Sequence, residues 1–132
     1  MSDFNQRDQG NRPPLINAAI DNSVAVTKSL LEAGAHVNSQ DSLGNSALHY
    51  AAQAYFPEIA AILIRNGATV DIQDQNGNTP LWRAIFNSRG RGELVTMLLK
   101  AGANKNLQNK HGKSPLELAR SIGNYDVAQF LN

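Results

Sequence analysis

The 132-residue sequence contains no cysteine, a single tryptophan and few charged side chains. Without cysteine there can be no disulfide framework, thiolate zinc site, iron–sulfur cluster or cysteine nucleophile. Charged residues make up 17% of the chain, against roughly 25% in an average globular protein, and hydrophobic residues make up 42%. This composition is apolar enough to bury a core and excludes a disordered chain.

The sequence also lacks long hydrophobic runs. No apolar run approaches the ~18 residues that a membrane-spanning helix needs, so we expect no membrane partner. The first twenty residues have no basic start followed by an apolar stretch, so we expect no secretory signal. Together with the missing cysteine, these features favour a cytoplasmic location. The length predicts one domain.

The formal net charge is only +1, but the two parts of the chain differ strongly. Residues 1–82 carry four basic and eight acidic side chains, a net charge of −4. Residues 83–132 carry eight basic and three acidic side chains, a net charge of +5. Such a field steers an acidic partner towards the basic half in a salt-dependent way.

The chain repeats itself. Three kinds of position recur at spacings of 33 and 35 residues: Gly-Ala pairs at 34, 67 and 102, leucines at 15, 48, 81 and 116, and Asp41, Asp74 and Asn109. All three agree that two residues are inserted late in the chain. A period of this length is typical of a repeat architecture.

Each copy predicts two short helices. Ser46, Thr79 and Ser114 each stand two residues after a glycine and can cap the first helix, and Pro80 and Pro115 suit its first turn. The second helix carries an apolar stripe at helical spacing, and in the first three copies it ends at a glycine. One helix pair cannot bury its apolar face, but stacked pairs can, so we predict an all-α solenoid.

These residues resemble the ankyrin repeat family, whose T-P-L-H-x-A motif is matched by SALHYA, TPLWRA and SPLELA. The resemblance implies stacked helix-turn-helix pairs joined by β-turn or hairpin loops. It places a single domain at 12–132, with repeats at about 12–40, 41–73, 74–108 and 109–132, after a flexible segment at 1–11. Tyr55 stands where the family usually has glycine, and the third copy has two extra residues in its helix-to-helix turn.

No catalytic arrangement is evident, and we expect a protein that is not an enzyme and binds no cofactor or metal. His49 occupies the signature histidine of the family, which implies a structural role. Gly112-Lys113-Ser114 imitates the end of a P-loop, but Leu107 stands where that motif needs glycine. Asp41 and Asp74 recur at one place in the repeat, which favours turn structure over acid–base chemistry.

The resemblance implies that a partner binds along a concave groove and the loop tips. Aromatic residues and arginine are enriched at binding hot spots, and several fall on these positions. We predict these partner-binding residues: Tyr50, Gln53, Asn76, Asn78, Arg83, Phe86, Asn87, Arg89, Arg91, Lys110, His111 and Lys113.

We therefore interpret the chain as a non-catalytic protein–protein interaction module, monomeric when free, whose partner presents an acidic surface. Because no second domain is evident, we expect it to inhibit or mask that partner, for example as a cytosolic immunity protein. The alternatives are a scaffold, or a nucleic-acid-associated binder that uses the basic C-terminal half. The acidic N-terminal half disfavours nucleic acid.

Overall fold

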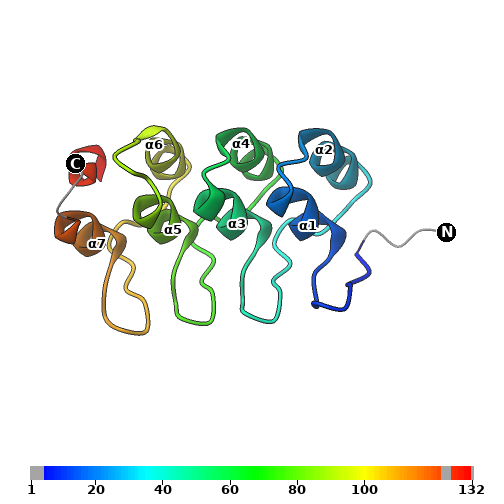
Figure 1. Cartoon of the computed structure of the whole chain (residues 1–132), viewed down its shortest axis with the longest axis horizontal. Helices are drawn as coiled ribbons and strands as arrows, with labels where there is room; N and C mark the ends of the chain where they lie inside the picture. The colour runs from blue at the N-terminus through cyan, green and yellow to red at the C-terminus, as the bar shows by residue number, and fades with distance from the viewer. Residues whose placement is uncertain (1–4, 123–125, 132) are drawn as a thin grey trace.

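The structure is a computed structural model that describes residues 5–122 and 126–131. Within these ranges the chain forms helices stacked in two rows and no strand (Figure 1). One row holds α1 (Pro14–Ile20), α3 (Ala47–Ala54), α5 (Pro80–Phe86) and α7 (Pro115–Ser121). The other row holds α2 (Val24–Glu32), α4 (Pro57–Arg65), α6 (Glu93–Lys100) and the 3-10 helix η1 (Val127–Leu131). The all-α solenoid predicted from the repeat period is confirmed.

The first helix of the second, third and fourth copies begins at the predicted cap. The side chains of Ser46, Thr79 and Ser114 each accept a hydrogen bond from the backbone N–H three residues on. Proline occupies the first turn of α1, α5 and α7, where its missing N–H leaves no helical hydrogen bond unmade. The loops between copies are turns, with one isolated bridge between Gln40 and Ser46 in place of the expected hairpins.

The core runs between the two rows. Leu48, Leu81, Ile59 and Leu94 are almost fully buried, and each side chain of this size contributes about 1.5–3 kcal/mol when removed from water. Alanines fill the places where first helices meet, because a small side chain lets neighbouring backbones approach closely. The repeats therefore share one continuous core.

The N-terminal segment contributes a turn to the first repeat. The sequence predicts a flexible segment at 1–11, and in the structure residues 8–12 form a turn closed by a hydrogen bond from the N–H of Asp8 to the carbonyl of Arg12 (2.9 Å). Asp8 Oδ1 accepts hydrogen bonds from the N–H groups of Gly10 (2.8 Å) and Arg12 (3.0 Å), and Asn11 takes a left-handed φ of 60°. The reason is that Asp8 lies one period of 33 residues before Asp41. Residues 1–4 lie outside the described part of the chain.

The helix-to-helix turns adapt to Tyr55 and to the insertion. Tyr55 ends α3 in the left-handed conformation, with a φ of 61°. Its hydroxyl accepts a hydrogen bond from the N–H of Leu94 (3.2 Å), and the Arg91 guanidinium lies 3.8 Å from the centre of its ring. The inserted turn thus closes over Tyr55 and holds α6 to the preceding repeat.

Candidate binding surface

Each repeat begins with a tip turn, and we use this name for residues 8–12, 41–45, 74–78 and 109–113. An Asp or Asn opens each tip turn, and one of its side-chain oxygens accepts two backbone N–H groups. In the third tip turn, Asp74 Oδ1 accepts from Asn76 (2.8 Å) and Asn78 (3.0 Å). Such Asx turns fix the tip backbone without help from a sheet.

The second carboxylate oxygen of each aspartate binds a side chain from the following helix, nine residues along the chain. Asp8 Oδ2 accepts from Asn17 Nδ2 (2.9 Å), and Asp41 Oδ2 accepts from the hydroxyl of Tyr50. In the third repeat, Asp74 Oδ2 accepts from Arg83 Nη2 at 2.6 Å. Three different side chains therefore hold the tip turn to the first helix at one repeated place.

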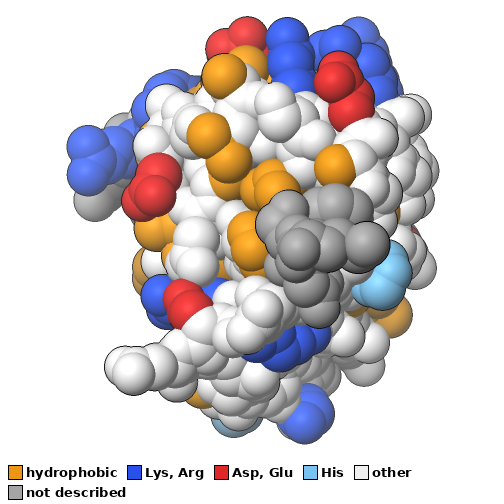
Figure 2. Space-filling model, turned by 90° about the vertical axis from the view of Figure 1, so that its right-hand side faces the viewer, with side chains coloured by type: hydrophobic (Ala, Val, Ile, Leu, Met, Phe, Trp, Pro, Cys, Tyr) orange, Lys and Arg blue, Asp and Glu red, His pale blue; other side chains and the backbone are white. Residues whose placement is uncertain are grey.

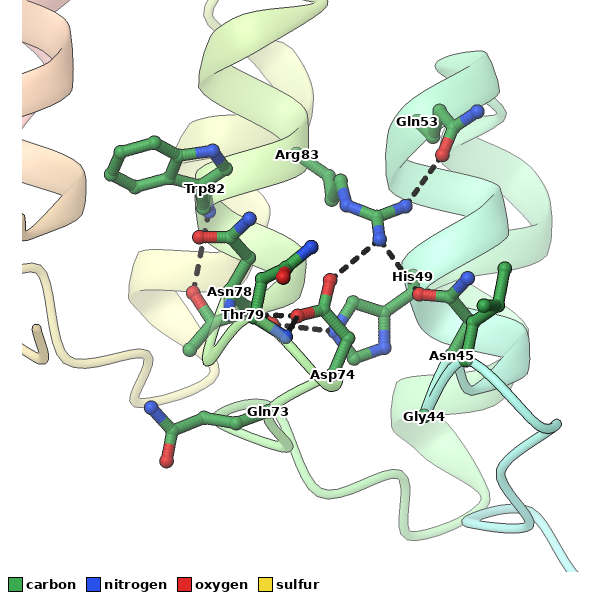
Figure 3. Close-up of polar contacts among 12 residues, drawn as sticks. Gly44, Asn45, His49, Gln53, Gln73, Asp74, Asn78, Thr79, Trp82 and Arg83 are labelled. Atoms are coloured by element: carbon green, nitrogen blue, oxygen red, sulfur yellow. Dashed lines mark hydrogen bonds and ion pairs between the residues drawn. The ribbon is translucent and has the colours of Figure 1, made fainter. Parts of the chain in front are cut away.

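Arg83 is the most connected of these side chains (Figure 3). Besides Asp74, its guanidinium donates to Asn45 Oδ1 (2.7 Å) and Gln53 Oε1 (2.5 Å). Both acceptors belong to the preceding repeat, so Arg83 joins α5 to its own tip turn, to the neighbouring tip turn and to α3. Only 18% of its side chain is exposed.

Hydrogen bonds keep Asp74 ionised inside this network. Burial of the carboxyl group opposes ionisation, but hydrogen bonds from the N–H of Asn78, the Arg83 guanidinium and the N–H of Asn76 outweigh it. The pKa of Asp74 therefore lies below its ordinary value.

His49 is a structural residue, as its place in the family motif implies. Its Nδ1 accepts the N–H of Ser46 (3.0 Å), so its Nε2 carries the proton and donates to the carbonyl of Asn78 (2.8 Å). Burial is the main cause that lowers the pKa of His49 to about 4, and the Arg83 charge lowers it further. The neutral ring thus caps α3 and links it by a hydrogen bond to the tip turn of the next repeat.

A second set of hydrogen bonds, from side chains to backbone carbonyls, links neighbouring tip turns, and no motif in the sequence predicted it. Gln40 Nε2 donates to the carbonyls of Gly44 (2.7 Å) and Gln73 (3.1 Å). In the first repeat, Arg7 donates in the same way to the carbonyls of Asn11 (2.9 Å) and Gln40 (2.8 Å). The repeat period does mark these residues, because Arg7, Gln40 and Gln73 are spaced by 33 residues.

Two adjoining hollows lie along α1, α3 and α5, and we call them together the groove. One, of about 380 Å³, is lined by Arg12, Ile20, Tyr50, Gln53, Ala54 and Asn87. The other, of about 280 Å³, is lined by Gln53, Trp82, Arg83, Phe86 and Asn87. The groove brings together five of the predicted partner-binding residues: Tyr50, Gln53, Arg83, Phe86 and Asn87.

These five residues are not equally free to meet a partner. Phe86 is 68% exposed, the largest value among the big hydrophobic side chains of the described residues. Arg83 and the Tyr50 hydroxyl are already engaged within the chain, so they shape the groove and offer it only their remaining surface. Asn87 Nδ2 donates to the Arg83 carbonyl (2.9 Å).

The other predicted residues lie outside the groove. Asn76, Lys110, His111 and Lys113 are exposed in the tip turns, while Asn78 is half-buried and bonded to His49. Arg89 is exposed in the turn between α5 and α6, where Arg91 stacks on Tyr55.

The basic half of the chain is only partly available to a partner. Lys105 donates to the carbonyl of Leu131 (2.5 Å), and Arg83 and Arg91 have the contacts given above. Within residues 83–122, Arg89, Lys100, Lys110, Lys113 and Arg120 are exposed with no hydrogen bond or ion pair from their side chains. Lys110 and Lys113 share the last tip turn with exposed His111.

Across 5–122 and 126–131, no three His, Asp or Glu side chains gather as a metal site. In the same part of the chain, no helix has the length and apolar character needed to cross a bilayer.

Comparison with known proteins gives the family. A family model described as "Ankyrin repeats (3 copies)" matches residues 15–109 and 56–132. The human neurogenic locus notch homolog protein 1 is 37% identical over 83 residues, which is 63% of this chain and 3% of that protein. The human SH3 and multiple ankyrin repeat domains protein 2 is 37% identical over 79 residues, 60% of this chain and 4% of that protein.

A mouse protein, NF-kappa-B inhibitor delta, is 35% identical over 81 residues, which is 60% of this chain and 25% of that protein. The chain thus spans a quarter or less of the length of these three curated relatives.

Proposed function

The chain belongs to the ankyrin repeat family, and from this premise we propose that it binds another protein along the groove and tip turns and thereby masks it. Members of this family are generally non-enzymatic modules for protein–protein interaction. The proposal adds where the partner binds, what its surface carries and what binding does to it.

The exposed ring of Phe86 is the observation that carries the proposal. A large apolar side chain at 68% exposure on a helix surface gains stability only when another surface covers it. Trp82 lies beside it in the same hollow, and aromatic anchors in preformed hollows are typical hot spots. The Arg83 network holds the walls of this hollow in place before any partner arrives.

The charge of the last tip turn supports an acidic partner. Lys110 and Lys113 are both exposed in the same tip turn, and the net charge of residues 83–132 is +5. A partner segment with apolar side chains for Phe86 and carboxylates for these lysines would match both features.

We also propose that binding masks the partner. One relative, NF-kappa-B inhibitor delta, carries the word inhibitor in its name, and the similarity covers 60% of this chain and 25% of that protein. A groove whose wall is held by the Arg83 hydrogen bonds suits a protein that acts by covering a surface. A scaffold would instead leave its partner active.

The test is a comparison of Phe86→Ala with Val26→Ala. Val26 is 49% exposed on α2, outside both the groove and the tip turns, so it is a matched control for loss of an exposed apolar side chain. We expect wild-type protein to co-purify with one partner from its native cell. With that partner purified, Phe86→Ala should weaken binding about 30-fold and Val26→Ala by less than threefold.

Equal affinity for Phe86→Ala and the wild type would refute the groove as the binding surface. For masking, the activity of the purified partner is measured with increasing amounts of the chain. Loss of activity at one equivalent supports inhibition, and unchanged activity in the saturated complex favours a scaffold. Salt-dependent retention on DNA, with no protein partner captured, would favour the nucleic-acid alternative instead.

A further inference from the structure

The N-terminal end of the stack exposes apolar side chains at places where the inner repeats bury them. Val26 on α2 is 49% exposed, whereas Ile59 on α4 and Leu94 on α6, which occupy the same place, are fully buried. Leu30 is half-buried, whereas its equivalents Leu63 and Leu98 are fully buried. Figure 2 looks at this end and shows apolar side chains on it with charged ones around them.

Within the described residues, α2 has a neighbour from the second row of helices on one side only. In the inner part of the stack, α2 packs against α4 and α4 packs against α6, so each second helix is covered by the one before it. Among the described residues, no helix covers the outer side of α2. A hollow of about 510 Å³ runs beside Val26 and is lined further by Pro14, Asp21 and Arg12. We call this surface the N-terminal face.

The opposite end of the stack carries charged side chains at places where the inner repeats bury uncharged ones. Arg120 on α7 occupies the place of Ala52 and Ile85, which are fully buried, and Arg120 itself is exposed. Glu117 likewise stands at the place of His49 and is exposed. Burying an unpaired charge is costly, so this end resists a further repeat. Among the described residues, the N-terminal end of the stack therefore exposes apolar side chains and the C-terminal end exposes charged ones.

We propose that the N-terminal face pairs with the same face of a second copy of this chain, related by a twofold axis. A twofold contact uses one patch twice, and it is the commonest form of homo-oligomer. Head-to-tail stacking would bury the charges of Arg120 and Glu117 against the N-terminal face of the next copy, and the cost of burying them disfavours that arrangement.

The balanced charge of the first repeat also supports a second copy of this chain as the partner. Residues 5–40 hold three basic side chains, Arg7, Arg12 and Lys28, and three acidic ones, Asp8, Asp21 and Glu32. Two such faces meet without net repulsion, whereas two copies of the basic C-terminal half repel each other. The pairing leaves the Phe86 hollow uncovered, because Phe86 lies on the third repeat, so it is independent of the proposed function.

The expected dimer is weak. One repeat face is smaller than the ~800 Å² per partner of a standard interface, so we expect dissociation constants of roughly 10 μM to 1 mM. Sedimentation equilibrium of the full chain at increasing concentration should show a monomer–dimer equilibrium. Val26→Glu should raise the dissociation constant at least tenfold, while Leu43→Glu, at an equally exposed leucine, should leave it unchanged.

The absence of native cysteine allows a direct test of orientation. With a short bismaleimide linker, Val26→Cys should cross-link to itself, and Arg120→Cys should not. Cross-linking of Val26→Cys only when mixed with Arg120→Cys would establish head-to-tail stacking and overturn the proposal. A monomer at every concentration up to about 1 mM would also overturn it. Circular dichroism of each variant confirms that it is folded.

Discussion

Arg83 Nη2 lies 2.6 Å from Asp74 Oδ2, nine residues earlier in the chain, and this pair joins α5 to its own tip turn. The Asp74 side chain is 1% exposed, so its charge depends on the partners around it. The same guanidinium reaches Asn45 and Gln53 of the repeat before. One side chain therefore couples the stability of two repeats to the shape of the groove.

Removal of Arg83 should destabilise the chain. Arg83→Met leaves the buried Asp74 carboxylate without its counter-ion, so we expect a loss of about 2–4 kcal/mol in the free energy of unfolding. Urea unfolding of Arg83→Met, Asp74→Asn and the double variant gives the coupling between them, expected at about 1–3 kcal/mol. Lys113→Met, at an exposed tip residue, should change stability by no more than about 0.5 kcal/mol. A coupling near zero would show that the pair acts independently.

Stability should fall between about pH 6.5 and 4. The pKa of His49 is about 4 in the folded chain, below the 6.5 of an ordinary histidine. The unfolded chain therefore binds more protons in this window, and folding loses up to about 3 kcal/mol as the pH falls through it. Urea unfolding of His49→Gln should show a flattened pH dependence here. His111→Gln, at an exposed tip, should keep the slope.

A second loss of stability should follow at lower pH. The pKa of Asp74 is held below 3.8, so its contribution is fully present above that pH and is lost as the pH falls through the lower folded value. In Asp74→Asn, unfolding measured below about pH 4 should depend less on pH than in the wild type. An unchanged slope would assign the acid loss to other carboxyl groups.

Thr27→Val should stabilise the chain. Thr27 is fully buried on α2, and its Oγ1 has no hydrogen-bond partner in the described part of the chain. Its equivalents on α4 and α6 are Ala60 and Val95, both fully buried. Replacing the unsatisfied hydroxyl by a methyl group should raise the free energy of unfolding by about 1–2 kcal/mol. Thr69→Val, at an exposed position, is the control, and an equal gain there would contradict the explanation.

Two tip glycines should respond differently to alanine. Gly77 and Gly112 have similar left-handed φ angles of 78° and 73°, so both variants carry the same backbone strain of about 1 kcal/mol. A Cβ on Gly77 would lie 2.8 Å from the backbone nitrogen of Lys110, whereas one on Gly112 would meet nothing within 4 Å. Thermal unfolding should therefore show Gly77→Ala as the less stable of the two. Equal loss would mean that the tip turns can separate.

The repeat period predicted most of the fold. Spacings of 33 and 35 residues located every helix pair, and the caps Ser46, Thr79 and Ser114 act as the sequence indicated. These features are local or periodic, so they can be recognised in a single sequence. The first tip turn was missed because Asn11 replaces the usual glycine, although Asp8 keeps the period.

The candidate site was less predictable. The residues at 17, 50 and 83 are Asn, Tyr and Arg, and their common role is to bind the aspartate nine residues before. Because their chemistry differs, no residue pattern marks the role, and Tyr50 and Arg83 looked free to meet a partner. The exposure of Phe86 depends on what the neighbouring repeats leave uncovered, which no helical pattern in one repeat contains.

The tip turns and the helix-to-helix turns differ in how they tolerate a change of length. Backbone hydrogen bonds tie the second tip turn to the third, from Gln75 N–H to the carbonyl of Leu43, and the third to the fourth, from Lys110 N–H to the carbonyl of Asn76, both at 3.0 Å. The two-residue insertion between α5 and α6 breaks no such link. Evolution can therefore lengthen this scaffold between its helices while it diversifies the tips by substitution alone. New binding specificities can arise on a backbone that does not change.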